Sequence, residues 1–274
     1  MIHRIESLAD GRIAEYAHVA NPAWLLDHGL FVVEGRLVVR RLLDTDRFAV
    51  HSVLVTPAAV AALGAVLAGD RYRDHLPVYV CEQDVLDQLA GFNFHRGCLA
   101  LAKRPLETVP LDRFAGANRL LALEGVGNPD NIGGLFRVAA AFAAGGVLLD
   151  PRCGDPLYRK AIRTSMGATL GIPFIQANSW LDDLRSLQRS GMKLLALTPD
   201  RSATTLRRFA ASIAPDQPLA LMVGAEGPGL TDAALEAADA RVRIPISPDV
   251  DSLNVAVAAG IALAILQPAR ADQF

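Results

Sequence analysis

Three loops rich in glycine or asparagine constrain this chain most, because each directly follows an apolar run. They span residues 128–137, 224–230 and 244–256, all in the C-terminal half. Open α/β sheets bind ligands where loops leave the ends of their strands, so we expect the three loops to meet. Together they carry an arginine, a glutamate and asparagines. They therefore predict one composite site rather than three separate turns.

Composition excludes several classes of protein. The chain has 274 residues, 51% of them hydrophobic, which is enough for two domains with buried cores. Its longest apolar run, residues 255–266, is shorter than the ~20 residues that span a bilayer, and its start lacks a secretory pattern. Cys81, Cys98 and Cys153 lack metal-ligand spacing. We expect a cytoplasmic protein with reduced cysteines, no metal and no membrane partner.

Net charge does not indicate a nucleic-acid partner. Residues 1–104 hold 11 Lys and Arg against 12 Asp and Glu, and residues 105–274 hold 16 against 17. A nucleic-acid-binding protein usually has a basic footprint, which here would have to be local. The candidates are Arg40-Arg41, His95-Arg96, Lys103-Arg104, and Arg159-Lys160 with Arg163.

Strands and helices alternate in two sets, which predicts an α/β protein. In the first set, strands are expected at residues 30–35, 50–55, 78–80 and 97–102, with helices at 36–44, 57–67 and 84–89 and one or two short helices within 1–27. In the second, strands are expected at 120–123, 146–149, 173–175, 194–197, 219–223 and 242–246, with helices at 133–144, 158–164, 180–189, 231–238 and 254–266. We predict a small domain over 1–104, a linker over 105–117 and a domain with a more parallel sheet over 118–274.

One interpretation of the first loop is a dinucleotide site. Gly125-Val126-Gly127 after one strand and Asp150 after the next mimic the βαβ unit of an NAD-linked oxidoreductase. The mimicry fails at the third glycine, because Asn128-Pro129-Asp130 follows instead. Pro129 also lacks the N–H that a pyrophosphate would use. The cofactor hypothesis is therefore weak.

The other interpretation gives Asn131 and Arg137 a function. Asn131 has the simpler alternative of capping the following helix. Arg137 lies in an otherwise apolar helix, where a lone arginine needs either a ligand or an ion pair. Glu226 and Glu124 are candidate partners for such a pair. We favour the ligand.

The remaining loops have simple interpretations when each is taken alone. Gly224, Gly227 and Gly229 allow a tight turn and a close approach to a ligand, and Glu226 among them is a turn residue or a buried acceptor. Ser252 and Asn254 stand where the last helix begins, a usual place for capping residues. The combination of the three loops is harder to explain in this way.

Together these residues resemble the SpoU-type, or TrmH-like, branch of the SPOUT RNA methyltransferases. The family's three motifs are matched in order by Asn131-Ile132-Gly133 with Arg137, by Gly224 to Leu230, and by Ile244-Pro245 with Ser252 to Val255. Arg163 to Ala168 resembles a further Ser-x-Gly-Ala segment, and residues 31–35 and 95–100 resemble an L30e-like substrate-binding domain. Asp249 and Asp251 make the third loop more acidic than is usual in the family.

The resemblance implies a fold, a cofactor and an assembly. The C-terminal domain would be a SPOUT α/β-knot with a deep trefoil knot and a mostly parallel sheet, and the N-terminal domain a smaller L30e-like α/β sandwich. S-adenosylmethionine would bind in the knot, at Gly224, Ile244 and Leu253. A second subunit would complete the site, which makes a homodimer the expected state.

The implied reaction is methylation of a ribose 2′-hydroxyl in structured RNA, with ribosomal RNA favoured over transfer RNA. Arg137 would act as the base or, since an arginine normally stays protonated, would hold the adjacent phosphate. Asn131, Glu226, Ser252 and Asn254 would orient Arg137 and the ribose. The alternatives are the NAD-linked oxidoreductase and an RNA-binding homologue that has lost its activity.

Overall fold

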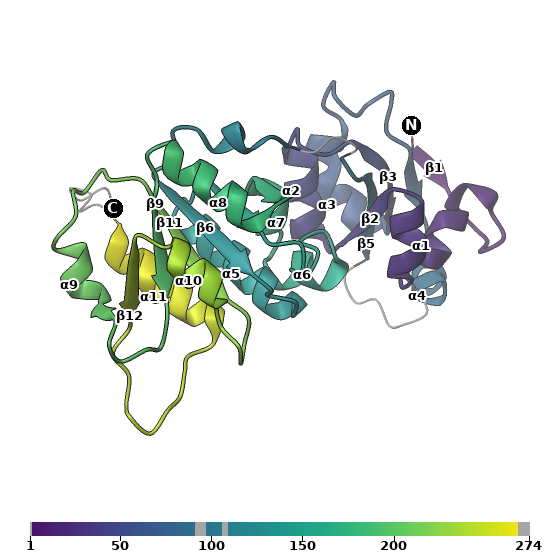
Figure 1. Cartoon of the computed structure of the whole chain (residues 1–274). Helices are drawn as coiled ribbons and strands as arrows, with labels where there is room; N and C mark the ends of the chain where they lie inside the picture. Colours follow the sequence, from purple (N-terminus) through teal and green to yellow (C-terminus); the bar gives the residue numbers. More distant parts are fainter. Residues whose placement is uncertain (1, 91–96, 106–108, 268–274) are drawn as a thin grey trace. The chain divides into compact units, whose positions relative to one another are not determined.

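The computed structural model describes residues 2–90, 97–105 and 109–267 (Figure 1). Packing divides the chain into two compact units, Met1–Leu106 with Leu157–Gly171 and Glu107–Pro156 with Ile172–Phe274. The first unit thus includes a segment that sequence analysis assigns to the C-terminal domain. The expected boundaries near residues 104 and 118 stay a prediction about independently folding domains. His95 and Arg96 lie outside the described residues.

The first unit is built on a five-stranded mixed sheet in the order β1-β4-β3-β5-β2. Its strands are β1 (Ile2–Arg4), β2 (Leu30–Glu34), β3 (Val50–Val55), β4 (Val78–Val80) and β5 (Cys98–Lys103). Strand β5 is antiparallel to β2 and β3, and the other pairings are parallel. Its helices are η1 (Gly11–His18), α1 (Pro22–Asp27), α2 (Arg36–Asp44), α3 (Pro57–Leu67), α4 (Gln83–Ala90), α6 (Arg159–Thr164) and α7 (Ala168–Gly171). Side chains of η1, α1 and α4 form one core cluster with Leu30, Val32 and Leu54 of the sheet. The unit is the expected α/β sandwich.

Buried charge and main-chain hydrogen bonds hold residues 157–171 in this unit. Glu34, at the end of β2, is only 6% exposed and lies 3.4 Å from both the Arg159 and the Arg163 guanidinium. A buried carboxylate is tolerated when it is paired in this way. Arg41 and Arg47 donate to the main-chain oxygens of the segment at residues 166 and 170. The segment is therefore part of the first unit's packing.

The second unit contains a seven-stranded sheet in the order β10-β12-β9-β11-β6-β7-β8, and every pairing in it is parallel. The strands are β6 (Arg119–Glu124), β7 (Gly146–Leu149), β8 (Phe174–Gln176), β9 (Lys193–Leu197), β10 (Thr204–Thr205), β11 (Leu219–Gly224) and β12 (Ala240–Arg243). The helices are η2 (Leu111–Phe114), α5 (Pro129–Ala141), α8 (Trp180–Arg189), α9 (Leu206–Ala210), α10 (Asp232–Ala237) and α11 (Val255–Leu266). Residues 219–223 are all buried, as expected for a strand covered on both faces.

The fold class is confirmed as α/β with a mostly parallel sheet, whereas the trefoil knot stays a prediction. Because all strands of the second sheet run the same way, their carboxyl ends lie along one edge. Glu124, Leu149, Gly224 and Arg243 end four of these strands, so the loops after them start from a common edge. In the described ranges, no helix has the length and apolar character needed to cross a bilayer.

Two of the expected boundaries that the structure corrects affect the site. Helix α5 begins at Pro129 rather than at Gly133, because the Asn128 side chain caps it by accepting from the Asp130 N–H at 2.8 Å. Asn131 is therefore inside the helix and is not its cap. Strand β12 ends at Arg243, so residues 244–246 belong to the following loop.

Candidate functional site

A hydrogen-bonded cluster joins the three loops. The Asn254 Nδ2 group donates to Asn131 Oδ1 at 2.9 Å and to Glu226 Oε1 at 3.2 Å. Asn131 is in the first turn of α5, Glu226 is in the loop after β11, and Asn254 precedes α11. We call these three residues the amide cluster. The loops thus meet within one chain, and the catalytic role expected of these residues stays a prediction.

The Asn254 side chain is held in place by its capping role. Its Oδ1 atom accepts from the N–H groups of Ala256 at 3.0 Å and Val257 at 3.3 Å, which caps α11. The amide oxygen therefore bonds to the helix, and both Nδ2 hydrogens bond to the other two loops. Capping and joining of the loops are two functions of one side chain. Asn131 is only 6% exposed, so its end of the cluster is buried.

Helices α5 and α11 approach closely beside the amide cluster. A Cβ atom built on Gly134 of α5 would lie 2.9 Å from the Cβ atom of Ala256, closer than real Cβ atoms come to one another. Glycine at position 134 therefore permits the contact. This contact and the Asn254–Asn131 hydrogen bond fix the starts of the two helices relative to each other.

The second loop is a tight turn with no room for a side chain at its start. A Cβ atom on Gly224 would lie 2.1 Å from the carbonyl carbon of Gly229. Gly227 and Gly229 have φ values of 90° and 72°, a region that favours glycine. Glu226 is exposed, so it is a turn residue whose carboxylate accepts from Asn254 rather than a buried acceptor.

The third loop has many unused main-chain groups. Within residues 244–253 the structure gives one hydrogen bond between main-chain groups, from Val250 N–H to Ser247 O at 3.2 Å, and one from the Asp249 N–H to the Ser247 hydroxyl at 3.4 Å. Ile244 and Leu253 are half-buried, and Ser252 is exposed. Ser252 makes no hydrogen bond to the described residues and does not join the amide cluster. The loop therefore offers main-chain donors and acceptors to a ligand.

Arg137 also lies outside the amide cluster of its own chain. It is exposed, and its side chain makes no hydrogen bond or ion pair within the described ranges. It stands six residues after Asn131 on α5, about 9 Å farther along the helix axis. The alternative of an ion pair with Glu226 or Glu124 is wrong. The Arg137 guanidinium is free to contact a partner molecule.

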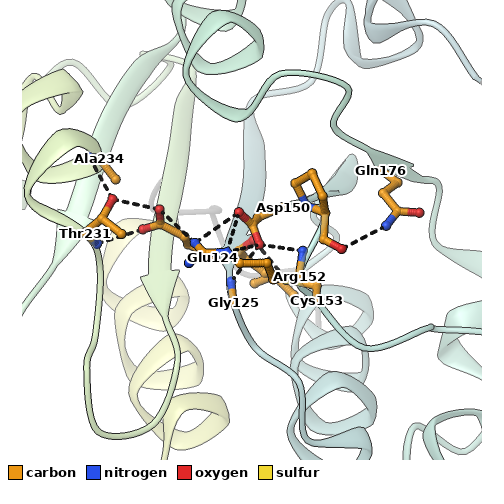
Figure 2. A network of polar contacts seen from close by, with 10 residues as sticks. Glu124, Gly125, Asp150, Arg152, Cys153, Gln176, Thr231 and Ala234 are labelled. Carbon is orange, nitrogen blue, oxygen red and sulfur yellow. Dashed lines mark hydrogen bonds and ion pairs between the residues drawn. The ribbon is translucent and has the colours of Figure 1, made fainter.

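A second polar network, which sequence analysis missed, lies at the ends of β6 and β7 (Figure 2). Glu124 is 2% exposed and accepts from the Thr231 N–H at 2.9 Å and the Thr231 hydroxyl at 2.8 Å. Asp150 is 4% exposed and accepts from the Gly125 N–H at 3.2 Å. The Arg152 guanidinium lies 3.2 Å from Asp150 and 3.5 Å from Glu124. The hydrogen bond to Asp150 raises the pKa of Arg152.

This network has two consequences for the site. The Glu124–Thr231 bonds fix the end of the glycine loop, because Thr231 follows Leu230 directly and caps α10. The Asp150 carboxylate is already bonded to Gly125 and Arg152, so it cannot also bind the ribose of a dinucleotide. The oxidoreductase hypothesis is therefore not supported. The one sequence signal for the network is the placement of both acids at strand ends.

The half-buried thiol near the network is not a nucleophile. Cys153 Sγ donates to the Leu123 carbonyl at 3.1 Å, and burial raises the pKa of this thiol to about 11. The thiolate is the reactive form of cysteine, so at neutral pH Cys153 is inert. All three cysteines are free.

Comparison with known proteins identifies the class of protein as an RNA methyltransferase. Residues 118–264 match the model of the SpoU rRNA Methylase family, and the chain belongs to this family. It is 43% identical over 233 residues to an uncharacterized tRNA/rRNA methyltransferase of Mycobacterium bovis, covering 85% of this chain and 79% of that protein.

Two further proteins are similar over much of the chain. A 23S rRNA (guanosine-2′-O-)-methyltransferase, RlmB, of a Burkholderia species is 37% identical over 183 residues, covering 65% of this chain and 72% of that protein. The crystal structure of an RNA 2′-O ribose methyltransferase has a TM-score of 0.75 and 28% identity, covering 96% of this chain and 98% of that chain.

Proposed function

We propose that this enzyme transfers the methyl group of S-adenosylmethionine to a ribose 2′-hydroxyl in structured RNA, with ribosomal RNA favoured over transfer RNA. The relatives named for 2′-O-methylation and for 23S rRNA support this choice of atom and RNA. The observation that carries the proposal is the amide cluster, in which Asn254 bonds to Asn131 and Glu226 at the carboxyl edge of a parallel sheet. An RNA substrate also makes the cytoplasm the expected location.

The chain's own residues fit S-adenosylmethionine, which when bound supplies a methyl group activated by a positively charged sulfur. Residues 244–253 offer main-chain donors and acceptors for its polar groups. Glu226 provides a carboxylate beside the proposed site of the positively charged sulfur. Gly224 ends β11 and Ile244 directly follows β12. Because β9 alone separates these two strands, the two residues lie about 10 Å apart at the same edge. We assign Gly224, Ile244 and Leu253 to this cofactor.

Arg137 is proposed to hold the phosphate next to the reacting ribose. It is exposed and unpaired within the described chain, so no internal contact competes for it. An arginine stays protonated in proteins, which favours this role over that of a base. As the 2′-oxygen bonds to the methyl carbon, the bond from that carbon to the cofactor's sulfur would break, and the hydroxyl proton would pass to an oxygen of the held phosphate. Asn131, Glu226, Ser252 and Asn254 are proposed to position the ribose.

We further propose a homodimer in which the partner subunit completes the site. Helix α11 is apolar along its whole length, and its residue Val257 is 52% exposed. A helix that faces solvent usually has polar residues on its exposed side. Ile246 and Val250 in the preceding loop are also exposed. A second copy covering this face would bury these residues. It would also supply its Arg137 to the amide cluster of the first copy, whose own Arg137 lies outside that cluster.

Two measurements test the function. Calorimetry should show that S-adenosylmethionine binds and that NAD does not. Incubation with labelled cofactor and transcribed 23S rRNA fragments should give a 2′-O-methyl nucleotide. Cofactor binding without methyl transfer to any rRNA or tRNA would support the inactive homologue, and a preference for NAD would reject the proposal altogether.

A further inference from the structure

Five arginines gather at the β10–β12 edge of the second unit's sheet. Residues 200–211 and 240–243 contain Arg201, Arg207, Arg208, Arg241 and Arg243 and one acid, Asp200. This local excess of four positive charges lies in a part of the chain, residues 105–274, that holds 16 Lys and Arg against 17 Asp and Glu. The rest of this part is therefore clearly negative, and the edge is its positive region.

Strand register brings three of these arginines together. Thr205 of β10 pairs with Arg243 of β12, and β10 runs directly into α9, which lies beside β12 (Figure 1). Arg207 is two residues after Thr205, so its Cα atom is within about 10 Å of that of Arg243. We call Arg207, Arg208 and Arg243 the edge arginines.

The edge arginines are available to a partner. Arg207 and Arg208 are exposed, and their side chains make no hydrogen bond or ion pair with any described residue. Arg243 donates its Nε to the Ala203 carbonyl at 3.2 Å and makes no ion pair within the described ranges. By contrast, Arg185 on α8 of the same unit lies 3.3 Å from Asp182. Arginines in the last turn of a helix can also be favoured by the helix dipole. This explains little for Arg207 and Arg208, because α9 has only five residues.

Their position relates them to the proposed site. Arg243 directly precedes Ile244, which begins the third loop at the carboxyl edge of the sheet. That loop carries Asp249 and Asp251, both exposed, which repel a phosphate backbone. An RNA strand that reaches the amide cluster therefore has a favourable path over the edge arginines and an unfavourable one over the loop.

We propose that Arg207, Arg208 and Arg243 bind consecutive phosphates of the RNA strand that flanks the methylated ribose. Arginine forks match phosphate oxygens, and a span of about 10 Å covers two to three phosphates of one strand. The contacts carry no sequence information; they add affinity and position the strand. This inference rests on the proposed function, since it assumes that RNA is the substrate.

The test is the salt dependence of RNA binding. The affinity of the full-length protein for a transcribed 23S rRNA fragment is measured over a KCl series for wild type, Arg207→Ala/Arg208→Ala and the control Arg185→Ala/Arg189→Ala. Affinity falls as salt rises, and loss of two phosphate contacts should make the slope of log affinity against log salt less steep by about 1.5 to 2. Affinity at low salt should fall by on the order of tenfold. The double variant Arg207→Lys/Arg208→Lys should restore much of the slope.

The outcomes separate this inference from the proposed function. An unchanged slope in Arg207→Ala/Arg208→Ala, or a change no larger than in the α8 control, would overturn the inference while wild-type methylation still supports the function. If the wild type neither binds nor methylates RNA, the proposed function fails and the inference with it. S-adenosylmethionine binding should be equal in all variants, which shows that the folded site is intact.

Discussion

Asn254 illustrates how a single side chain can cap a helix and join three loops. The exchange Asn254→Asp separates these functions, because the carboxylate keeps the oxygens that cap α11 but loses the donors to Asn131 and Glu226. It also places a second negative charge beside Glu226. We expect stability within about 1 kcal/mol of wild type and a marked loss of methyl transfer. Asn254→Ala, which loses the cap too, should cost about 1 kcal/mol more in urea unfolding.

Arg137 allows a cleaner test, because it supports nothing in its own chain. Arg137→Ala should leave the unfolding free energy within about 0.5 kcal/mol of wild type and should abolish methyl transfer. Arg137→Lys keeps the charge but not the two-pronged geometry, so it should retain a small part of the activity. Steady-state turnover on transcribed rRNA measures both variants. Turnover of the Ala variant equal to wild type would remove Arg137 from the mechanism.

Sequence patterns found some of the site residues and missed others for a physical reason. Asn131, Glu226 and Asn254 were found because each stands in a motif next to a strand or helix end. The Glu124–Thr231 contact was missed because its members are 107 residues apart and meet only when β6 and β11 pair. A pairing of this length has no local signature.

At the scale of elements, periodicity predicted several helices to the residue but missed two short strands. Helices Arg36–Asp44, Pro57–Leu67 and Trp180–Arg189 have the expected bounds. Strands β1 and β10, with three and two residues, are too short to show alternation and were missed. The strand expected to reach residue 246 ends at Arg243, where Pro245 follows without an N–H for the ladder.

Arg119 determines how one of these elements ends. It is 6% exposed, and its guanidinium donates to the carbonyls of Leu266, at 2.7 and 3.0 Å, and of Asn118, Gln217 and Pro215. Leu266 is the last residue of α11, and the bonds from Arg119 satisfy its carbonyl. Arg119 thus caps the C-terminal end of α11. Burial lowers the pKa of Arg119, but an arginine remains charged at neutral pH.

Replacing Arg119 should therefore destabilise the second unit. Arg119→Met leaves several buried carbonyls without a donor, which we expect to cost about 2 to 4 kcal/mol in urea unfolding. Arg119→Lys keeps the charge but supplies fewer donors and should fall between Met and wild type. The control is Arg113→Met, at an exposed arginine six residues earlier, which should change stability by less than about 0.5 kcal/mol. Equal effects of the two Met variants would contradict the capping role.

At the scale of the whole molecule, the chain leaves the second unit after Pro156, joins the first and returns at Ile172. Alternation of strands and helices along the sequence could not reveal this exchange, because α6 is an ordinary helix between two strands. The unit into which α6 packs depends on the ion pairs between Glu34 and two arginines of α6. Both arginines are more than 120 residues from Glu34 in the sequence. The two units are thus connected by three stretches of chain.

The proposed homodimer makes a prediction about surface residues. Val257→Lys places a charge on the apolar face of α11 and should shift the protein towards monomer in sedimentation, with loss of methyl transfer. The matched control is Leu37→Lys in α2, because Leu37 is 51% exposed, nearly the same as Val257, but belongs to the first unit. The control should remain at the wild-type oligomeric state. Dissociation of neither variant would contradict an interface at α11.

A mixing experiment tests whether the two subunits share a site. Arg137→Ala and Asn254→Ala chains should each be inactive alone. If the Arg137 of one subunit acts at the amide cluster of the other, a mixed dimer has one site with both defects and one site with neither. Random exchange of equal amounts should then restore about a quarter of wild-type turnover, since half of the dimers are mixed and each has one intact site. If Arg137 instead acts within its own chain, both sites of a mixed dimer carry one defect and no activity returns. Recovery in the mixture therefore distinguishes a site shared between two chains from a site built by one.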